Sequence, residues 1–145
     1  MIATVDLNIV LDVHCERAPF STDSRIVLNL IEKRVVIGVF ASHALTTLYY
    51  IARKDIGRPK AEAVVEYVLK HFNIIGLHRA RWEFALRAGF SDFEDAAIAT
   101  VAESSGSAVL ITRNVPHFAR SKVRAVTPWD FIWQGPTQPG PQTPP

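Results

Sequence analysis

The order in which short β-branched runs and helical segments alternate is the feature that most constrains the fold of this chain. Apolar runs with the length and composition of buried strands occupy residues 2–5, 35–40, 74–77, 108–112 and 125–127. Apolar residues at helical spacing are found up to residue 13 and at residues 21–33, 43–54, 59–72, 78–88, 92–104 and 128–133. Strands separated by helices in this way form a parallel sheet with both faces covered. The sequence therefore predicts an α/β protein of three layers, α/β/α, around a central, mainly parallel sheet of about five strands.

The alternation predicts one domain over residues 1–133. A chain of 145 residues suits a single domain and is long enough to bury roughly two-thirds of its unfolded surface. Residues 134–145 contain five of the nine prolines and no apolar anchor, so we expect this tail to be disordered.

Composition excludes several classes of protein. No apolar run reaches the ~18 residues that a membrane-spanning helix needs, which excludes a helical membrane protein. Asp6 and Asp12 lie where a signal peptide has a basic start, so we expect a cytoplasmic protein. The single Cys15 excludes an internal disulfide, and the five histidines lack the ligand spacing of a zinc site.

The charge balance is nearly neutral. The net charge of +2 is compatible with a nucleic-acid substrate but does not argue for one. Basic residues form modest clusters within residues 53–60, 79–87 and 113–124. The favoured interpretation of each cluster is a solvated surface of mixed charge.

Polar residues follow the predicted strands at the edge where a parallel sheet binds its ligands, beyond the carboxyl ends. Asp6 follows the first strand, Thr47 lies in the first turns of the helix after the second, and Asn114 follows the fourth. Residues 91–95, Ser-Asp-Phe-Glu-Asp, open the helix that leads into the fourth strand. Oxygen-rich clusters of this kind suit Mg²⁺ or Mn²⁺, because packed carboxylates repel one another unless a cation lies between them. Such an ion can activate water for attack on a phosphodiester.

Each of these residues also has a purely structural interpretation. Asp6 alone can cap the next helix, and Asp92 and Glu94 can cap or solvate the start of theirs. Asn114 can stabilise a turn. We expect His43 to be partly buried or capping, because nothing near it in the sequence completes a ligand set. The functional interpretation therefore depends on convergence at one edge of the sheet.

Two segments resemble motifs of the PIN domain family. They are VDLNIVLDV, with an acid after the first strand and then an apolar helix, and GFSDFEDAAIATVAESSGSAVLITRN. In the second, an acid opens a helix rich in small residues, and a strand ending in Thr-Arg-Asn follows. The stretch ASHALTTLYYIARKDIGRPKA is also similar to a PIN subfamily. The resemblance spans about residues 1–133, and many PIN domains are toxins of VapBC-type toxin–antitoxin pairs.

The resemblance implies a metal-dependent endoribonuclease that acts as the toxin of such a pair, with Mg²⁺ or Mn²⁺ as cofactor. It assigns Asp6 and Asp95 as metal ligands. The expected catalytic residues are Asp6, Asp95, Asp92 and Asn114, and the expected supporting residues are Asn8, Thr47, Glu94 and Thr112. The implied partners are an RNA substrate, a small antitoxin and a second copy in a homodimer. Tyr49 and Tyr50 are candidate contact residues for a protein partner, although ordinary core is their favoured interpretation.

Two positions depart from the family pattern. The family usually has Glu or Asp on the helix after strand two, where this chain has Thr47, and often an acid after strand four, where it has Asn114. Two dependable carboxylates suit one weakly held ion better than a fixed two-metal site. A second hypothesis is therefore a PIN-like domain that has lost catalysis and binds RNA or a protein. A third hypothesis, a small-molecule phosphatase or nucleotide-binding domain, lacks the expected Gly-rich phosphate loop after strand one.

Overall fold

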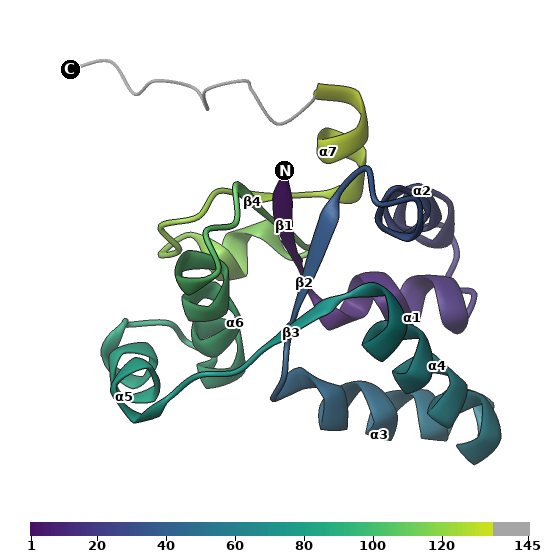
Figure 1. Ribbon diagram of the computed structural model, residues 1–145, viewed down its shortest axis with the longest axis horizontal. Helices are drawn as coiled ribbons and strands as arrows, with labels where there is room; N and C mark the ends of the chain where they lie inside the picture. Colours follow the sequence, from purple (N-terminus) through teal and green to yellow (C-terminus); the bar gives the residue numbers. More distant parts are fainter. Residues whose placement is uncertain (135–145) are drawn as a thin grey trace.

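A computed structural model describes residues 1–134, and these form an α/β fold around one five-stranded sheet (Figure 1). All neighbouring strands are parallel, in the order β3-β2-β1-β4-β5. Their bounds are β1 Ile2–Val5, β2 Ile37–Ala41, β3 Asn73–Ile75, β4 Val109–Ile111 and β5 Ala125–Val126. The predicted fold class and the five strands are confirmed.

Helices cover both faces of the sheet. They are α1 Leu7–His14, α2 Ser21–Glu32, α3 Ala44–Ile56, α4 Arg58–His71, α5 Arg79–Arg87, α6 Phe93–Ser104 and α7 Pro128–Gln134, with a 3₁₀ helix, η1, at Val115–Phe118. In Figure 1, α1 to α4 lie on one side of the sheet and α5 and α6 on the other. This follows from right-handed crossovers, because the chain steps from β1 through β2 to β3 and then returns past β1 to β4.

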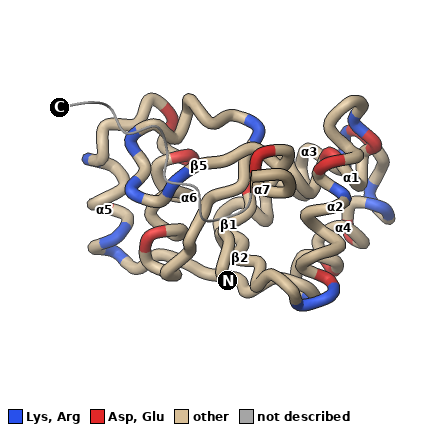
Figure 2. Tube along the Cα trace, turned by 90° about the horizontal axis from the view of Figure 1, so that it is seen from above, with Lys and Arg blue, Asp and Glu red and all other residues tan. Residues whose placement is uncertain are grey.

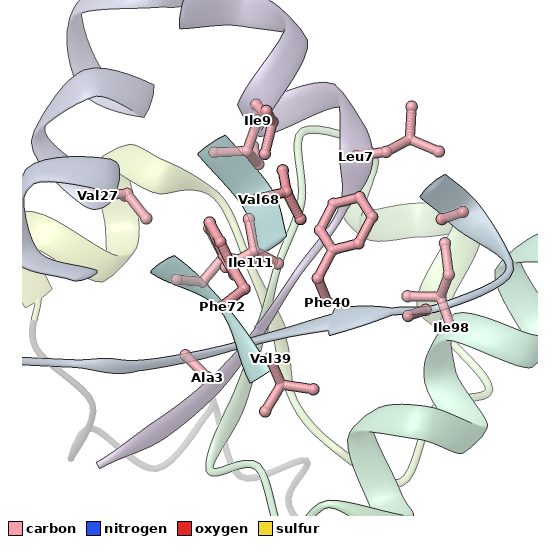
Figure 3. Packing of buried hydrophobic residues seen from close by; sticks show 14 of the residues in the cluster. Ala3, Leu7, Ile9, Val27, Val39, Phe40, Val68, Phe72, Ile98 and Ile111 are labelled. Carbon is pink, nitrogen blue, oxygen red and sulfur yellow. The ribbon is translucent and has the colours of Figure 1, made fainter. Parts of the chain in front are cut away.

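The core lies between the sheet and these helices. The strand residues Ala3, Phe40 and Leu110 are fully buried because both faces of the sheet are covered. Phe40 packs edge-on against Phe72 at the end of α4, with ring centroids 5.9 Å apart (Figure 3). Small buried residues on α6 let this helix approach the sheet closely; they are Ala96, Ala97, Ala99 and Ala102.

The helix ends agree with the sequence signals to within a few residues, with one addition. Gly57 adopts φ +81°, which ends α3 and begins α4 as expected from its lack of a Cβ. The 3₁₀ helix η1, which begins with Val115-Pro116, was not expected from the sequence and brings His117 beside α6. Gln134 is the last residue of α7, and the rest of the expected tail, residues 135–145, lies outside the described residues. Within residues 1–134, no helix has both the length and the apolar character required to cross a membrane.

Candidate active site

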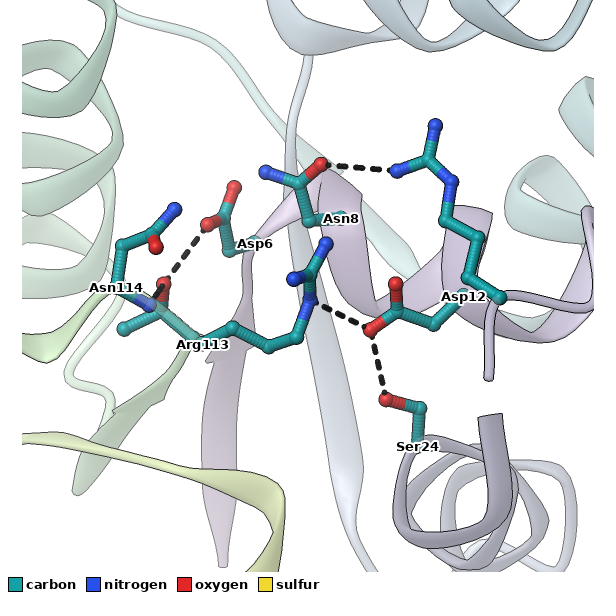
Figure 4. A network of polar contacts seen from close by, with 8 residues as sticks. Asp6, Asn8, Asp12, Ser24, Arg113 and Asn114 are labelled. Atoms are coloured by element: carbon teal, nitrogen blue, oxygen red, sulfur yellow. Dashed lines mark hydrogen bonds and ion pairs between the residues drawn. The ribbon is translucent and has the colours of Figure 1, made fainter. Parts of the chain in front are cut away.

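The strand order reverses between β1 and β4, and the candidate site lies beyond the carboxyl ends of these two strands, where such a reversal leaves a crevice. Asp6 follows β1, and its backbone N–H donates to the carbonyl of Ile111 in β4 over 2.9 Å. The Thr112 hydroxyl donates to Oδ2 of Asp6 over 2.8 Å and accepts the backbone N–H of Asn114 over 3.0 Å (Figure 4). Residues 106 positions apart in the sequence are thereby joined at the centre of the site.

Asp6 is a buried carboxylate at the start of α1. It occupies the N-cap position of α1, but its side chain makes no capping hydrogen bond. The residue is only 4% exposed, and burial raises the pKa of its carboxyl group. The Thr112 hydroxyl, the backbone N–H groups of Leu7 and Asn8 and the nearby charge of Arg113 act in the opposite direction and favour the ionised form.

The start of α6 contributes three further acids. Asp92 caps the helix by accepting the backbone N–H of Asp95 over 3.0 Å, so the structural interpretation of Asp92 is confirmed. Glu94 accepts the Thr47 hydroxyl over 3.3 Å, and burial raises the pKa of Glu94. Asp95 lies 3.4 Å from Nδ1 of His117.

The pKa of Asp95 is raised by several features of the site. Burial, followed by the negative charges of Asp92 and Asp6, raises its pKa from 3.8 to about 6, and His117 partly offsets this. Asp95 therefore carries a charge that its surroundings disfavour. A cation placed among these acids would reverse that effect.

One cavity of about 210 Å³ brings most of the predicted site residues together. It is lined by Asp6, Leu7, Asn8, Thr47, Ile51, Asp92, Glu94, Asp95 and Ile98. Of the eight residues expected at the site, only Thr112 and Asn114 do not line it; Thr112 holds Asp6, and Asn114 adjoins Thr112. The convergence predicted from the strand ends is therefore present in the structure.

The acids fit a single hard cation with an incomplete protein shell. Within residues 1–134, no three His, Cys, Asp or Glu side chains are arranged so as to hold a metal ion by themselves. Mg²⁺ is commonly held by one or two carboxylates and keeps several water ligands, so it does not require such a triad. The cavity offers the carboxylates of Asp6 and Asp95, with oxygens of Asn8, Thr47 and Glu94 also lining it. This oxygen-rich, incomplete set suits Mg²⁺ better than structural zinc, which is held by a closed set of four ligands, mostly sulfur and nitrogen.

Asp12, a second buried acid beside the site, was not identified from the sequence. Asp12 has a completely buried side chain, and its Oδ2 pairs with Nε of Arg113 over 2.8 Å and accepts the Ser24 hydroxyl over 3.2 Å (Figure 4). Burial raises the pKa of Asp12, and the Arg113 charge opposes this. The interpretation of residues 113–124 as a solvated cluster is wrong for Arg113, whose side chain is only 22% exposed. The sequence could have revealed Asp12, because it is an acid inside the apolar run IVLDV. A buried acid in such a run requires a partner.

The remaining basic residues agree with the expected mixed surface. Figure 2 shows Lys and Arg around α5 at one end of the molecule and on α1 to α4 at the other, with Asp and Glu among them. His43 is half-buried with its ring against Trp82, 5.3 Å between centroids, and burial lowers its pKa. Its expected structural role is confirmed.

The raised pKa of Asp95 predicts a pH-dependent stability difference. The folded protein binds a proton at Asp95 between pH 3.8 and about 6, where the unfolded chain does not, so this group stabilises the fold at low pH and loses that contribution as pH rises through 6. In EDTA, Asp95→Asn should therefore melt above the parent protein at pH 7.5, and the difference should shrink as pH falls to 4. Thermal melts across this range test it, and a difference independent of pH would contradict it.

The PIN domain family model matches residues 3–116. The structure of VapBC2 from Rickettsia felis bound to a promoter DNA fragment is similar with a TM-score of 0.66, 19% identity, and coverage of 88% of this chain and 98% of that chain. VapBC-1 from nontypeable Haemophilus influenzae is similar with a TM-score of 0.60, 20% identity, and coverage of 89% and 99%. No functionally curated protein matches the sequence.

Proposed function

The chain belongs to the PIN domain family, and we propose that it is a Mg²⁺- or Mn²⁺-dependent endoribonuclease that acts as the toxin of a toxin–antitoxin pair. The observation that carries the proposal is the cavity beyond β1 and β4 that Asp6 and Asp95 both line. The pKa of each of these acids is raised, so the surroundings disfavour the ionised form. Groups whose pKa is raised by burial and like charge are typical of functional sites. A bound divalent ion supplies polarisation of the phosphoryl oxygen and a lower pKa of water.

The residues of the chain have separate tasks in this proposal. Asp6 and Asp95 hold the ion, and the Thr112 hydroxyl keeps the Asp6 carboxylate in one orientation. Glu94 is suited to accept the proton of the attacking water at Oε1, because burial raises its pKa while Thr47 engages Oε2. Asn8 lines the same cavity and is placed to orient water or phosphate.

We place the antitoxin and dimer contacts on the face of α3 and α4. A groove of about 530 Å³ between these helices is lined by Leu45, Thr46, Tyr49, Tyr50, Arg53, Glu62, Val65 and Glu66. Tyr50 is 65% exposed, so ordinary core is the wrong interpretation for it. Exposed aromatic residues beside an apolar groove with a charged rim suit a protein contact. The similar solved structures are of VapBC2 and VapBC-1, which supports an antitoxin as one such partner. The proposed setting for the pair is the cytoplasm.

The test is metal-dependent cleavage of single-stranded RNA by the purified full chain. We expect cleavage with Mn²⁺ or Mg²⁺, none in EDTA, and recovery when excess Mn²⁺ is returned. Cleavage that survives EDTA would contradict the mechanism, because the acids of the cavity have no activating role without a cation.

A second candidate function is a binding module without catalysis. Its support is the pair Thr47 and Asn114, which bring oxygen ligands but no charge to positions where the family has acids. On this alternative the chain binds RNA or a protein partner with equal affinity in Mn²⁺ and in EDTA and cleaves nothing. Measuring cleavage and binding on the same RNA separates the two functions.

A further inference from the structure

We infer that the pocket beside Arg113 is a subsite that stacks one base of the RNA next to the cleaved phosphate. The inference rests on the proposed ribonuclease function for its substrate. The pocket has a volume of about 240 Å³ and is lined by Phe20, Asp23, Ser24, Arg113, Thr127, Pro128 and Trp129. Drug-sized ligands commonly occupy cavities of about 300–1,000 Å³, so this space suits a single ring system.

The pocket presents flat groups for stacking. The Arg113 guanidinium lies over the Phe20 ring, with its central carbon 4.1 Å from the ring centroid. Phe20 and Trp129 are 43% and 53% exposed, and both line this one pocket, so their rings are accessible to a ligand there. Protein sites that bind single-stranded RNA stack bases on aromatic rings and on arginine planes.

Arg113 is held in place by the interior of the protein. Its Nε pairs with the completely buried Asp12, whose Oδ2 is also bound by the Ser24 hydroxyl. One edge of the guanidinium is therefore occupied and one face is covered by Phe20, while 22% of the side chain remains exposed. A guanidinium fixed in this way loses little freedom when a base stacks on it or accepts its N–H groups.

The pocket adjoins the catalytic cavity through consecutive residues. Thr112 binds Asp6, and Arg113, the next residue, forms part of the pocket. For an RNA strand whose phosphate lies at Asp6 and Asp95, we assign a neighbouring base to this pocket, against Arg113 and Trp129. The same Arg113 charge that stabilises ionised Asp6 also attracts the RNA backbone.

Asp23 points to the kind of base that fits. A carboxylate on the pocket wall repels a phosphate but accepts N–H groups, and Arg113 donates to base acceptors. Guanine offers both acceptors for arginine and amino donors for a carboxylate, whereas uracil has no exocyclic amino group. We therefore expect guanine to be preferred over uracil at this subsite.

Trp129 provides a direct test with a matched control in the same helix. Trp133 lies four residues further along α7, is 67% exposed and does not line the pocket. Homopolymeric RNA hexanucleotides are titrated in EDTA against the parent, Trp129→Phe and Trp133→Phe while tryptophan fluorescence is followed. We expect quenching in the parent and in Trp133→Phe, its loss in Trp129→Phe, and stronger binding of the guanine oligomer than of the uracil oligomer.

Affinity provides the second measurement. Trp129→Ala should weaken hexanucleotide binding about tenfold, because stacking of one base contributes that order of affinity, and Trp133→Ala should leave it unchanged. Equal effects of the two variants on quenching and affinity would overturn the subsite, even if the protein cleaves RNA. Loss of binding in Trp129→Ala without any cleavage in Mn²⁺ would support the subsite and contradict the proposed nuclease function.

Discussion

Asp95→Asn is expected to lose at least about 100-fold in RNA cleavage while melting at a higher temperature than the parent protein at pH 7.5 in EDTA. The loss follows from removing one of the two carboxylates proposed to hold the ion. The gain in stability follows from the pKa of about 6, because at pH 7.5 the parent protein holds an ionised carboxylate that is partly buried and lies near Asp92 and Asp6. That cost is on the order of 1–3 kcal/mol at neutral pH, and solvent access keeps it toward the lower end.

The opposite signs of these two effects make the test specific. A substitution that merely damaged the fold would lower both activity and melting temperature. Asp6→Asn should lose activity as fully, and its shape allows the Thr112 hydroxyl to donate to the amide oxygen instead of the carboxylate. Glu83→Gln on α5, an exposed acid outside the cavity, serves as the matched control and should change neither quantity. A fully active Asp95→Asn protein would refute the proposed metal site.

The arrangement of strands and helices could be predicted because it depends on local patterns. The central strands β1 and β4 are short apolar runs that the structure buries almost completely, and the helices carry their apolar residues at helical spacing. The position of Asp6 at the site follows from these patterns alone, since the carboxyl ends of parallel strands share one edge. The arrival of Asp95 at the same cavity depends on α6 leading directly into β4.

The contacts between distant residues could not be predicted in the same way. Asp12 and Arg113 form an ion pair although they are 101 positions apart, and the local sequence around either residue does not identify its partner. His117 reaches Asp95 through the short helix η1, whose geometry depends on tertiary packing against α6. The pocket of Phe20 and Trp129 joins the loop before α2 to α7, so it exists only once β5 has placed α7 beside α2.

Thr47 lines the cavity, and its hydroxyl contacts one of the acids there. The sequence comparison with the family identified Thr47 as a place where an acid is missing. In the structure its hydroxyl donates to Glu94 over 3.3 Å, so Thr47 adjoins an acid contributed by α6. This contact supports our proposal that Glu94 on α6 supplies a carboxylate that other members of the family supply from the helix after strand two.

Thr47→Glu should tighten Mn²⁺ binding about ten- to a hundredfold and lower the melting temperature in EDTA. The new carboxylate would stand beside Glu94 and within the cavity of Asp6 and Asp95, where like charges raise one another's pKa. Two unit charges about 4 Å apart near a protein surface interact by up to about 4 kcal/mol, which sets the ceiling for both effects. A cation converts this repulsion into attraction, so the gain in affinity and the loss of stability have one cause.

Thr46→Glu is the matched control for this change. Thr46 precedes Thr47 on α3, lines the groove toward α4, and donates to the carbonyl of His43 rather than to an acid of the site. It should add the same charge without altering Mn²⁺ affinity. Calorimetric titration with Mn²⁺, together with melting in EDTA and in excess Mn²⁺, gives affinity and stability for the parent and both variants. If Thr47→Glu behaved like Thr46→Glu, no cation would bind among these acids, and the binding module without catalysis would be the better account of this chain.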